Sequence, residues 1–272
     1  MKFFREIYAR LFEERYFIYK GSGGLFHNLT ALSRAIRMAE QQNRKLIIDM
    51  KRHPAFPFDL STFFTLDKEH WEDYSILEKF DSEKANAIRE GKARAYLKQK
   101  INFEDKIIVY VAAGKGPIDK RLKVNTGIME KLKNETPLNE PYIAVHFRNT
   151  DKQNDISSFI EQIKKIQSEK KINVLYLASD YYEAYDLMKK QLPDMKLIRK
   201  VIPLQGVKNI HYHTKDKYKQ IYESLVDVYF ILQSDYFVPS YNSGYSKGIV
   251  NMIEHNNYLF PYFSSQTKVV KF

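Results

Sequence analysis

The chain has 272 residues, of which 44% are hydrophobic, and this is enough apolar material for one large or two modest α/β domains rather than a disordered chain. It contains no cysteine, which excludes disulfides, iron–sulfur clusters, thiolate zinc sites and a cysteine nucleophile. Charged residues interrupt every apolar run well before the roughly 18 residues that a membrane-spanning helix needs, so we expect neither such a helix nor a signal peptide.

The formal net charge of +11 does not come from a basic cluster. The 44 lysines and arginines are spread along the chain among 33 acidic residues. Many of the lysines fall on predicted helices, where a solvated face explains them. We therefore predict no nucleic-acid partner, and the charge instead suits an anionic glycolipid or a phosphate-rich acceptor. The lack of cysteine fits a cytoplasmic protein.

Residues 1–15 carry apolar side chains at helical spacing, so one face of the predicted helix is apolar and the other is charged. Packing against the body of the protein is the favoured interpretation. The alternative is peripheral contact with the inner face of a membrane. The apolar positions are Phe3, Phe4, Ile7, Tyr8, Leu11 and Phe12.

A strand, a glycine-rich turn, a helix and a second strand follow, which is the order of a parallel α/β unit. A more polar region comes next, and a further buried strand ends this half of the chain. The predicted strands are 16–19, 46–49 and 107–113, the glycine turn is 21–24, and the helices are 26–42 and stretches around 82–99.

The second half alternates strands and helices of a length that predicts a parallel sheet covered on both faces. The lysine-rich segment 120–140 separates the halves, so we predict an N-terminal lobe over 1–125 and a C-terminal lobe over 126–272. The fold class is α/β, with two Rossmann-like lobes that face a cleft. The predicted strands are 142–147, 173–178, 196–202 and 235–238, and the helices are 157–169, 182–191, 218–232 and 244–255.

Ligands of such sheets bind beyond the carboxyl ends of the strands, so the residues there are the candidates for chemistry. Gly21, Gly23 and Gly24 form a turn before a helix, where backbone N–H groups and the helix dipole suit a phosphate. A tight turn that serves only packing explains the glycines equally well. The spacing matches neither the dinucleotide fingerprint nor a P-loop.

The segment from His146 to Lys152 directly follows another predicted strand. Alternation directs His146, Arg148 and Lys152 towards the cleft. Arg148 could bind a diphosphate through its planar fork, and Lys152 could neutralise a leaving phosphate oxygen. The alternative is a surface turn in which Asp151 pairs with Arg148.

Three further polar residues lie at strand ends or on a helix. Asp180 follows a strand, and Ser243 opens the last helix, where it either caps the helix or meets a phosphate. Asp227 lies close to the apolar stripe of its helix and needs a donor if it is buried. A ligand amide or guanine edge and a protein arginine are the two candidate donors.

His211 and His213 could form a metal pair, but the sequence offers no third ligand, so we predict no metal site. No Gly-x-Ser-x-Gly elbow is present, which disfavours a serine hydrolase.

Together these segments resemble the α-1,6-fucosyltransferases that modify the core of N-glycans and the related bacterial nodulation fucosyltransferases. Residues 146–152 are similar to the family motif His-Val-Arg-Arg-Thr-Asp-Lys, and residues 174–180 to its Tyr-Leu-Ala-Thr-Asp-Asp motif. Residues 225–243 resemble the third motif, and the glycine turn matches in order. The resemblance covers most of 16–50 and 141–255.

The resemblance implies a GT-B-like fold whose C-terminal lobe binds most of the donor. It implies an inverting glycosyltransferase that uses GDP-fucose and needs neither a metal nor another cofactor. Carried over by position, His146 and Asp227 hold the guanine, and Arg148 and Ser243 contact the diphosphate. The backbone of Gly21, Gly23 and Gly24 lies nearby, and Lys152 and Asp180 face the reacting sugar.

This sequence departs from the family pattern at two places. Asn149 stands where the family has its second arginine, and Ile156 stands where it has its proposed general base. Asp155 is the neighbouring acid and the substitute we predict as the base. The chain also lacks the family's additional domains, so the acceptor, a glycan or glycolipid, stays open. The alternatives are a transferase that uses another GDP-sugar and a non-catalytic nucleotide- or glycan-binding protein of the same fold.

Overall fold

The computed structural model describes residues 15–21, 23–50, 53, 55–66, 71–73, 107–112, 116–135, 138–149, 154–206, 215–261 and 263–271. The predictions for residues 1–14 and for helical stretches around 82–99 lie outside these ranges. So do the predictions for Lys152 and for the histidines at 211 and 213.

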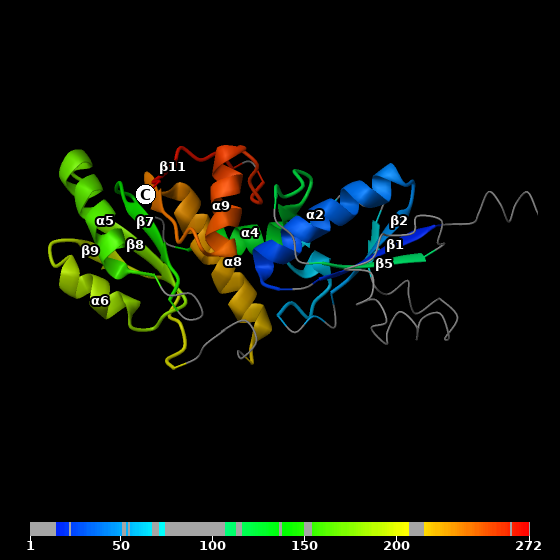
Figure 1. Cartoon of the computed structure of the whole chain (residues 1–272), viewed down its shortest axis with the longest axis horizontal. Helices are drawn as coiled ribbons and strands as arrows, with labels where there is room; N and C mark the ends of the chain where they lie inside the picture. Colours follow the sequence, from blue (N-terminus) through cyan, green and yellow to red (C-terminus); the bar gives the residue numbers. More distant parts are fainter. Residues whose placement is uncertain are drawn as a thin grey trace, which may run out of the picture.

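Two parallel sheets lie at opposite ends of the long axis of the molecule, and helices lie between them (Figure 1). Every neighbouring pair of strands in each sheet is parallel, as the alternation of strands and helices predicts. The first sheet has the order β4 (Trp71–Asp73), β2 (Lys45–Asp49), β1 (Tyr16–Gly21), β5 (Ile107–Ala112). The second has the order β11 (Lys268–Val269), β10 (Tyr236–Val238), β7 (Ile143–Phe147), β8 (Val174–Ser179), β9 (Lys196–Ile198).

Some of the described helices lie in the centre of the molecule between the two sheets, and others lie on the outer side of the second sheet (Figure 1). In the first lobe, α2 connects β1 to β2 and buries Leu29, Leu32, Ile36 and Ala39, which lie on one face at helical spacing. The helices are α2 (Leu25–Gln41), α4 (Thr126–Lys133), α5 (Ile156–Lys170), α6 (Ala184–Gln191), α8 (Lys217–Gln233) and α9 (Gly244–Glu254).

The central strand β7 divides the core of the second lobe in two. Ile143, Val145 and Phe147 pack in the same cluster as α5. Ala144 packs in the cluster that contains residues of α8 and α9. Because side chains alternate along a strand, His146 points to the same face as Ala144, and this face is the one towards the centre of the molecule.

The two lobes meet where α2 packs against α9. Two glycines one helical turn apart make this close approach feasible. A Cβ atom on Gly248 would lie 2.2 Å from Cδ1 of Phe26, and one on Gly244 would lie 2.5 Å from Nε2 of His27. We call this contact the α2–α9 seam, and it consists of Phe26 and His27 against Gly244 and Gly248.

Replacing Gly248 with alanine is expected to destabilise the protein by about 1–3 kcal/mol, because the added methyl overlaps the Phe26 ring. A thermal or urea melt measures this. The matched control is Gly127→Ala in α4, where the nearest atom to a new Cβ is Oδ1 of Asn125 at 3.7 Å. The control is expected to be neutral or stabilising by up to about 1 kcal/mol, through helix propensity alone. Equal shifts in melting temperature for the two variants would contradict the close packing of α2 against α9 at Gly248.

Some elements differ from the sequence predictions. The strand predicted over 196–202 ends at Ile198. The two-residue strands β3 (Phe64–Thr65), β6 (Lys123–Val124) and β11 and the 3-10 turn η1 (Leu60–Thr62) were not predicted, because elements this short carry too little periodicity. Helix α4 was not predicted either, and it lies in the lysine-rich segment that we predicted to separate the lobes. The boundary predicted between residues 125 and 126 falls at the start of α4, and the division into lobes there stays a prediction.

No helix in the described ranges is both long enough and apolar enough to cross a bilayer.

Candidate functional site: a cavity between the two lobes

A cavity of about 680 Å³ lies where the ends of β7 and β8 face the starts of α2 and α9. Helix α8 forms a further wall, and residues 201–204 form another. The cavity therefore takes residues from both lobes. His146, Arg148, Asp180, Asp227, Ser243 and Gly24, all predicted from the sequence as site residues, line it together.

His146 is 5% exposed and lies at the end of β7. Its Nδ1 is 2.7 Å from the hydroxyl oxygen of Ser246, and its ring centroid is 4.8 Å from that of Tyr245. Burial, helped by the positive charge of Arg148, lowers the pKa of His146 to about 3. The imidazole is therefore neutral at physiological pH, with Nε2 as the ring nitrogen left to meet a ligand.

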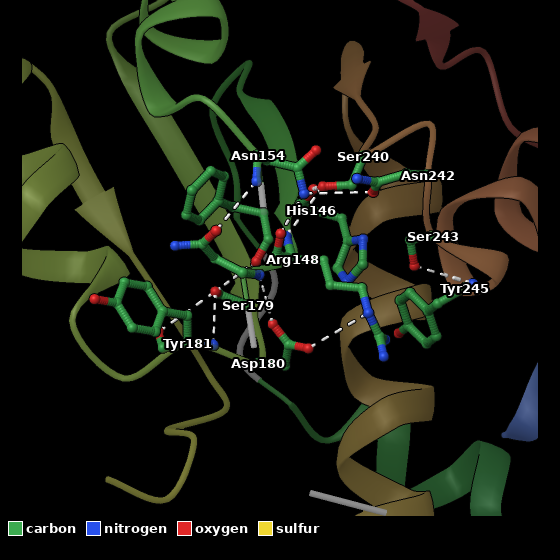
Figure 2. Close-up of polar contacts among 12 residues, drawn as sticks. His146, Arg148, Asn154, Ser179, Asp180, Tyr181, Ser240, Asn242, Ser243 and Tyr245 are labelled. Carbon is green, nitrogen blue, oxygen red and sulfur yellow. Dashed lines mark hydrogen bonds and ion pairs between the residues drawn. The ribbon is translucent and has the colours of Figure 1, made fainter. Parts of the chain in front are cut away.

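Arg148 extends from the end of β7 towards the ring of Tyr245 (Figure 2). Its Nε lies 3.7 Å from Oδ2 of Asp180, and the two side chains are only 13% and 15% exposed. Oδ1 of Asp180 accepts a hydrogen bond of 3.1 Å from the backbone N–H of Asn149. Asp180 thus holds both residues that follow β7, and it fixes the direction of the guanidinium.

A second set of hydrogen bonds ties the loop after β7 to the end of β10 (Figure 2). The Ser240 hydroxyl donates to the carbonyl of His146 at 2.8 Å and accepts from the N–H of Arg148 at 3.0 Å. The Asn154 amide donates to the carbonyl of Arg148. Oδ1 of Asn149 accepts from the N–H of Asn154 at 3.1 Å. Asn149, which stands at the position of the family's second arginine, therefore helps to close this loop.

Asp227 is 8% exposed and faces the cavity from α8. Its Oδ1 accepts a hydrogen bond of 2.7 Å from the hydroxyl of Tyr176 in β8. The donor is thus a tyrosine rather than the arginine we considered from the sequence. Burial, with a smaller contribution from the charge of Glu223, raises the pKa of Asp227 from 3.8 to about 7.

Two helix starts face the cavity. Ser243 caps α9, with its hydroxyl accepting from the N–H of Tyr245 at 3.2 Å, and it also lines the cavity. Gly24 is the N-cap of α2 and has no side chain to satisfy the first N–H groups. The starts of both helices thus present backbone N–H groups and positive dipole ends to the same space.

The other glycines of the turn shape it without lining the cavity. Gly23 has a φ of +93°, and its carbonyl accepts from the Asn28 amide at 3.0 Å. A Cβ on Gly21 would lie 2.6 Å from Oδ1 of Asn28. Both positions therefore require glycine, and the turn is held by Asn28.

Asp155, the predicted general base, is exposed and caps α5, with its Oδ1 accepting from the N–H of Ser157 at 3.0 Å. It is not one of the residues that line the cavity. Its position thus gives it an architectural role, and the assignment as a base stays a prediction. Lys152 lies outside the described residues.

Several residues of the cavity were missed by the sequence reasoning. Tyr245 is partly buried between His146 and Phe26, and its hydroxyl donates to the carbonyl of Ser224 at 2.7 Å. Glu223 and His27 also line the cavity. An apolar or helical context surrounds each of them in the sequence, so no local pattern distinguished them from core or surface residues.

The fold is similar to solved fucosyltransferase structures. NodZ α-1,6-fucosyltransferase soaked with GDP-fucose is 15% identical, with a TM-score of 0.58 over 88% of this chain and 92% of that chain. Fucosyltransferase NodZ from Bradyrhizobium is 16% identical, with a TM-score of 0.56 over 87% and 92%. POFUT1 in complex with GDP is 12% identical, with a TM-score of 0.61 over 96% and 99%.

No protein-family profile and no curated protein sequence matches the chain. The similarity to the solved structures therefore concerns the fold. It confirms the predicted α/β fold with two GT-B-like lobes, and it confirms at the level of fold the resemblance to fucosyltransferases that the motifs indicated.

Proposed function

We propose that this chain is an inverting, metal-independent glycosyltransferase that transfers fucose from GDP-fucose to a glycan or glycolipid acceptor. One observation carries the proposal: groups suited to a guanine edge and groups suited to a diphosphate line the same cavity. The similar solved structures support it, since they include complexes with GDP and with GDP-fucose.

The guanine is assigned to Asp227 and His146. The edge of guanine that carries N1–H and the exocyclic amine presents two donors, and a carboxylate accepts both. The ring nitrogen Nε2 of His146 supplies a second polar contact beside it. Tyr176 and Ser246 hold the two side chains in place through bonds of 2.7 Å each, which fixes their orientation before the nucleotide binds.

The diphosphate is assigned to Arg148, Ser243 and the starts of α2 and α9. Asp180 and Ser240 hold the Arg148 segment, so the guanidinium is oriented at little entropic cost on binding. Positive groups placed where the departing oxygen gains charge can replace a divalent ion. We expect activity to survive EDTA for this reason.

In the proposed reaction the acceptor hydroxyl oxygen forms a bond to the anomeric carbon as the bond from that carbon to the diphosphate oxygen breaks. The electron pair leaves with GDP, and the acceptor proton passes to a base. Asp155 is the base we predicted, and Lys152 and Asp180 are the residues assigned to the sugar. The direct approach of the acceptor inverts the anomeric centre.

Asp155→Asn is expected to reduce turnover at least about 100-fold if Asp155 is the base, because an amide cannot take the proton. Asparagine caps helices as well as aspartate does, so the melting temperature is expected to stay within about 1 °C. Transfer rate and thermal melting of the same preparation measure the two effects. A variant with the wild-type rate removes Asp155 from the reaction and moves the search for the base elsewhere.

The test of the proposal is a ligand panel. Thermal shift and donor hydrolysis are measured with GDP, GDP-fucose, GDP-mannose and UDP-glucose. Stabilisation by the guanine nucleotides, at about 2.7 kcal/mol when the ligand is at 100 times its Kd, and hydrolysis of GDP-fucose are expected. If GDP at millimolar concentration does not stabilise the protein, the proposal is contradicted. If another GDP-sugar is turned over faster than GDP-fucose, that sugar takes the place of fucose in the proposed reaction.

A binding protein without activity is the second candidate. The exposed, helix-capping position of Asp155 and the apolar Ile156 at the family's acid position favour it. GDP binding without turnover on any donor would select this candidate.

A further inference from the structure

His27 is a residue of the N-terminal lobe that reaches the part of the cavity assigned to the diphosphate. It lies in the first turn of α2 and lines the cavity together with Gly24, Arg148 and Ser243. Arg148 and Ser243 belong to the C-terminal lobe, so His27 brings a side chain of the N-terminal lobe to the same part of the cavity.

The imidazole spans the distance between the two helix starts. A Cβ atom on Gly244, the first residue of α9, would lie 2.5 Å from Nε2 and 2.8 Å from Cε1 of His27. A Cβ atom on Gly23, in the turn before α2, would lie 3.4 Å from Nδ1. The ring therefore packs closely on the backbone at the start of α9 and lies near the turn before α2, and these are the places where phosphate oxygens are expected to bind.

The C-terminal lobe offers fewer cations than the family motif implies. Asn149 replaces the second arginine, and its side chain is engaged with the N–H of Asn154. A departing diphosphate gains negative charge and needs donors that are already in place. An imidazole is a compact donor, and the missing side chain at Gly244 leaves room for it directly over the first turn of α9.

We propose that His27 donates an imidazole N–H hydrogen bond to an oxygen of the leaving diphosphate and thereby acts as a catalytic residue supplied by the N-terminal lobe. The inference rests on the proposed GDP-sugar function. As the bond between the anomeric carbon and the phosphate oxygen breaks, the electron pair stays on that oxygen. The histidine keeps its proton and stabilises the new charge.

The competing explanation is that His27 only fills the α2–α9 seam. In that case its loss affects the packing of the lobes, and it weakens every ligand of the cavity alike. A donor to the diphosphate instead affects only ligands and steps in which the second phosphate takes part. The comparison of GDP with GMP separates the two explanations.

The experiment measures Kd for GDP and GMP by calorimetry, and turnover of GDP-fucose, for the wild type, His27→Ala and His27→Gln. We expect His27→Ala to weaken GDP about 10- to 100-fold, the effect of losing a hydrogen bond to a charged group, and GMP less than threefold. Turnover falls in parallel. Glutamine retains an N–H donor, so His27→Gln is expected to recover most of the preference for GDP. Leu29→Val, a core substitution in the same helix outside the cavity, is the control for general destabilisation.

The outcomes separate the two proposals. A wild type that binds neither nucleotide, or both equally, overturns the proposed function and this inference with it. A wild type that prefers GDP, with the same preference in His27→Ala, overturns the inference alone. A Leu29→Val variant that loses the preference as strongly as His27→Ala assigns the effect to packing and also overturns it. If His27→Ala does not fold, His27→Gln decides, since a GDP preference lost in this folded variant overturns the donor role.

Discussion

Arg148→Ala is expected to slow transfer from GDP-fucose by about 30- to 1000-fold, which corresponds to about 2–4 kcal/mol of transition-state stabilisation. The guanidinium lies at the end of β7, is 13% exposed and is held 3.7 Å from Asp180. It faces the cavity at the place assigned to the leaving diphosphate. Because the charge on that group grows as the bond breaks, the variant should lose more in turnover than in affinity for the donor.

The matched control for Arg148 is Arg199→Ala. Arg199 directly follows β9 as Arg148 directly follows β7, but its guanidinium lies 4.5 Å from the ring of Tyr185 and is outside the cavity lining. We expect this control to keep the wild-type rate. Arg148→Lys keeps the charge without the planar fork and should fall between the two. A wild-type rate in Arg148→Ala would remove Arg148 from the reaction.

Asp227→Asn is expected to weaken GDP about 100-fold, because an amide group replaces one oxygen that accepts from the guanine edge. The wild type should also show a pH dependence. Burial raises the pKa of Asp227 to about 7, and the guanine edge requires the ionised carboxylate. Affinity is therefore expected to rise about tenfold between pH 6 and pH 8, with release of a proton on binding.

The phosphate groups of GDP titrate near the same pH, so guanosine is the ligand that isolates the carboxylate. Its affinity should rise with pH in the wild type and stay flat in Asp227→Asn. His146 stays neutral across this range, since its pKa is about 3. A flat wild-type profile for guanosine, measured by calorimetry, would remove Asp227 from the guanine site.

The raised pKa of Asp227 also makes the free energy of unfolding depend on pH. The folded protein holds a proton on Asp227 that the unfolded chain releases above about pH 4, so this group stabilises the fold at low pH. That contribution is lost as the pH rises through 7. His146 acts in the opposite direction, because its depressed pKa costs stability below about pH 6.5. Of these two groups, only Asp227 changes its contribution to stability between pH 6.5 and 8.

The sequence predicted most of the parallel strands, though not β4 or β11, and the candidate residues at the strand ends, because both follow from local patterns. The period-2 alternation of β7 placed His146 on one face and the strand end placed Arg148 and Asp180 beyond the sheet. Asp155 shows where such reasoning stops. An aspartate directly before an apolar helix is a typical cap, and the structure gives it that position, whereas the family motif suggested chemistry.

The contacts that orient the site could not be predicted, since they join residues far apart in the chain. Tyr176 alternates with leucines in an apolar strand, and nothing in its neighbours indicates that its hydroxyl meets Asp227, 51 positions later. The α2–α9 seam is a similar case. At position 248 only glycine fits against Phe26, and this constraint can be seen only when the two helices are placed side by side.

The starts of α2 and α9, which we assign to the diphosphate, would bind it through main-chain amides, and this affects how the site can evolve. An amide is common to all residue types except proline, so substitutions around the two helix starts leave the ligand's partners in place while the bend at Gly21 and Gly23 survives. Related proteins can then diverge widely in sequence and still present the same main-chain donors to a nucleotide. Backbone structure at this site is therefore expected to be conserved more strongly than amino-acid sequence. Relatives of this chain should be sought by comparing structures.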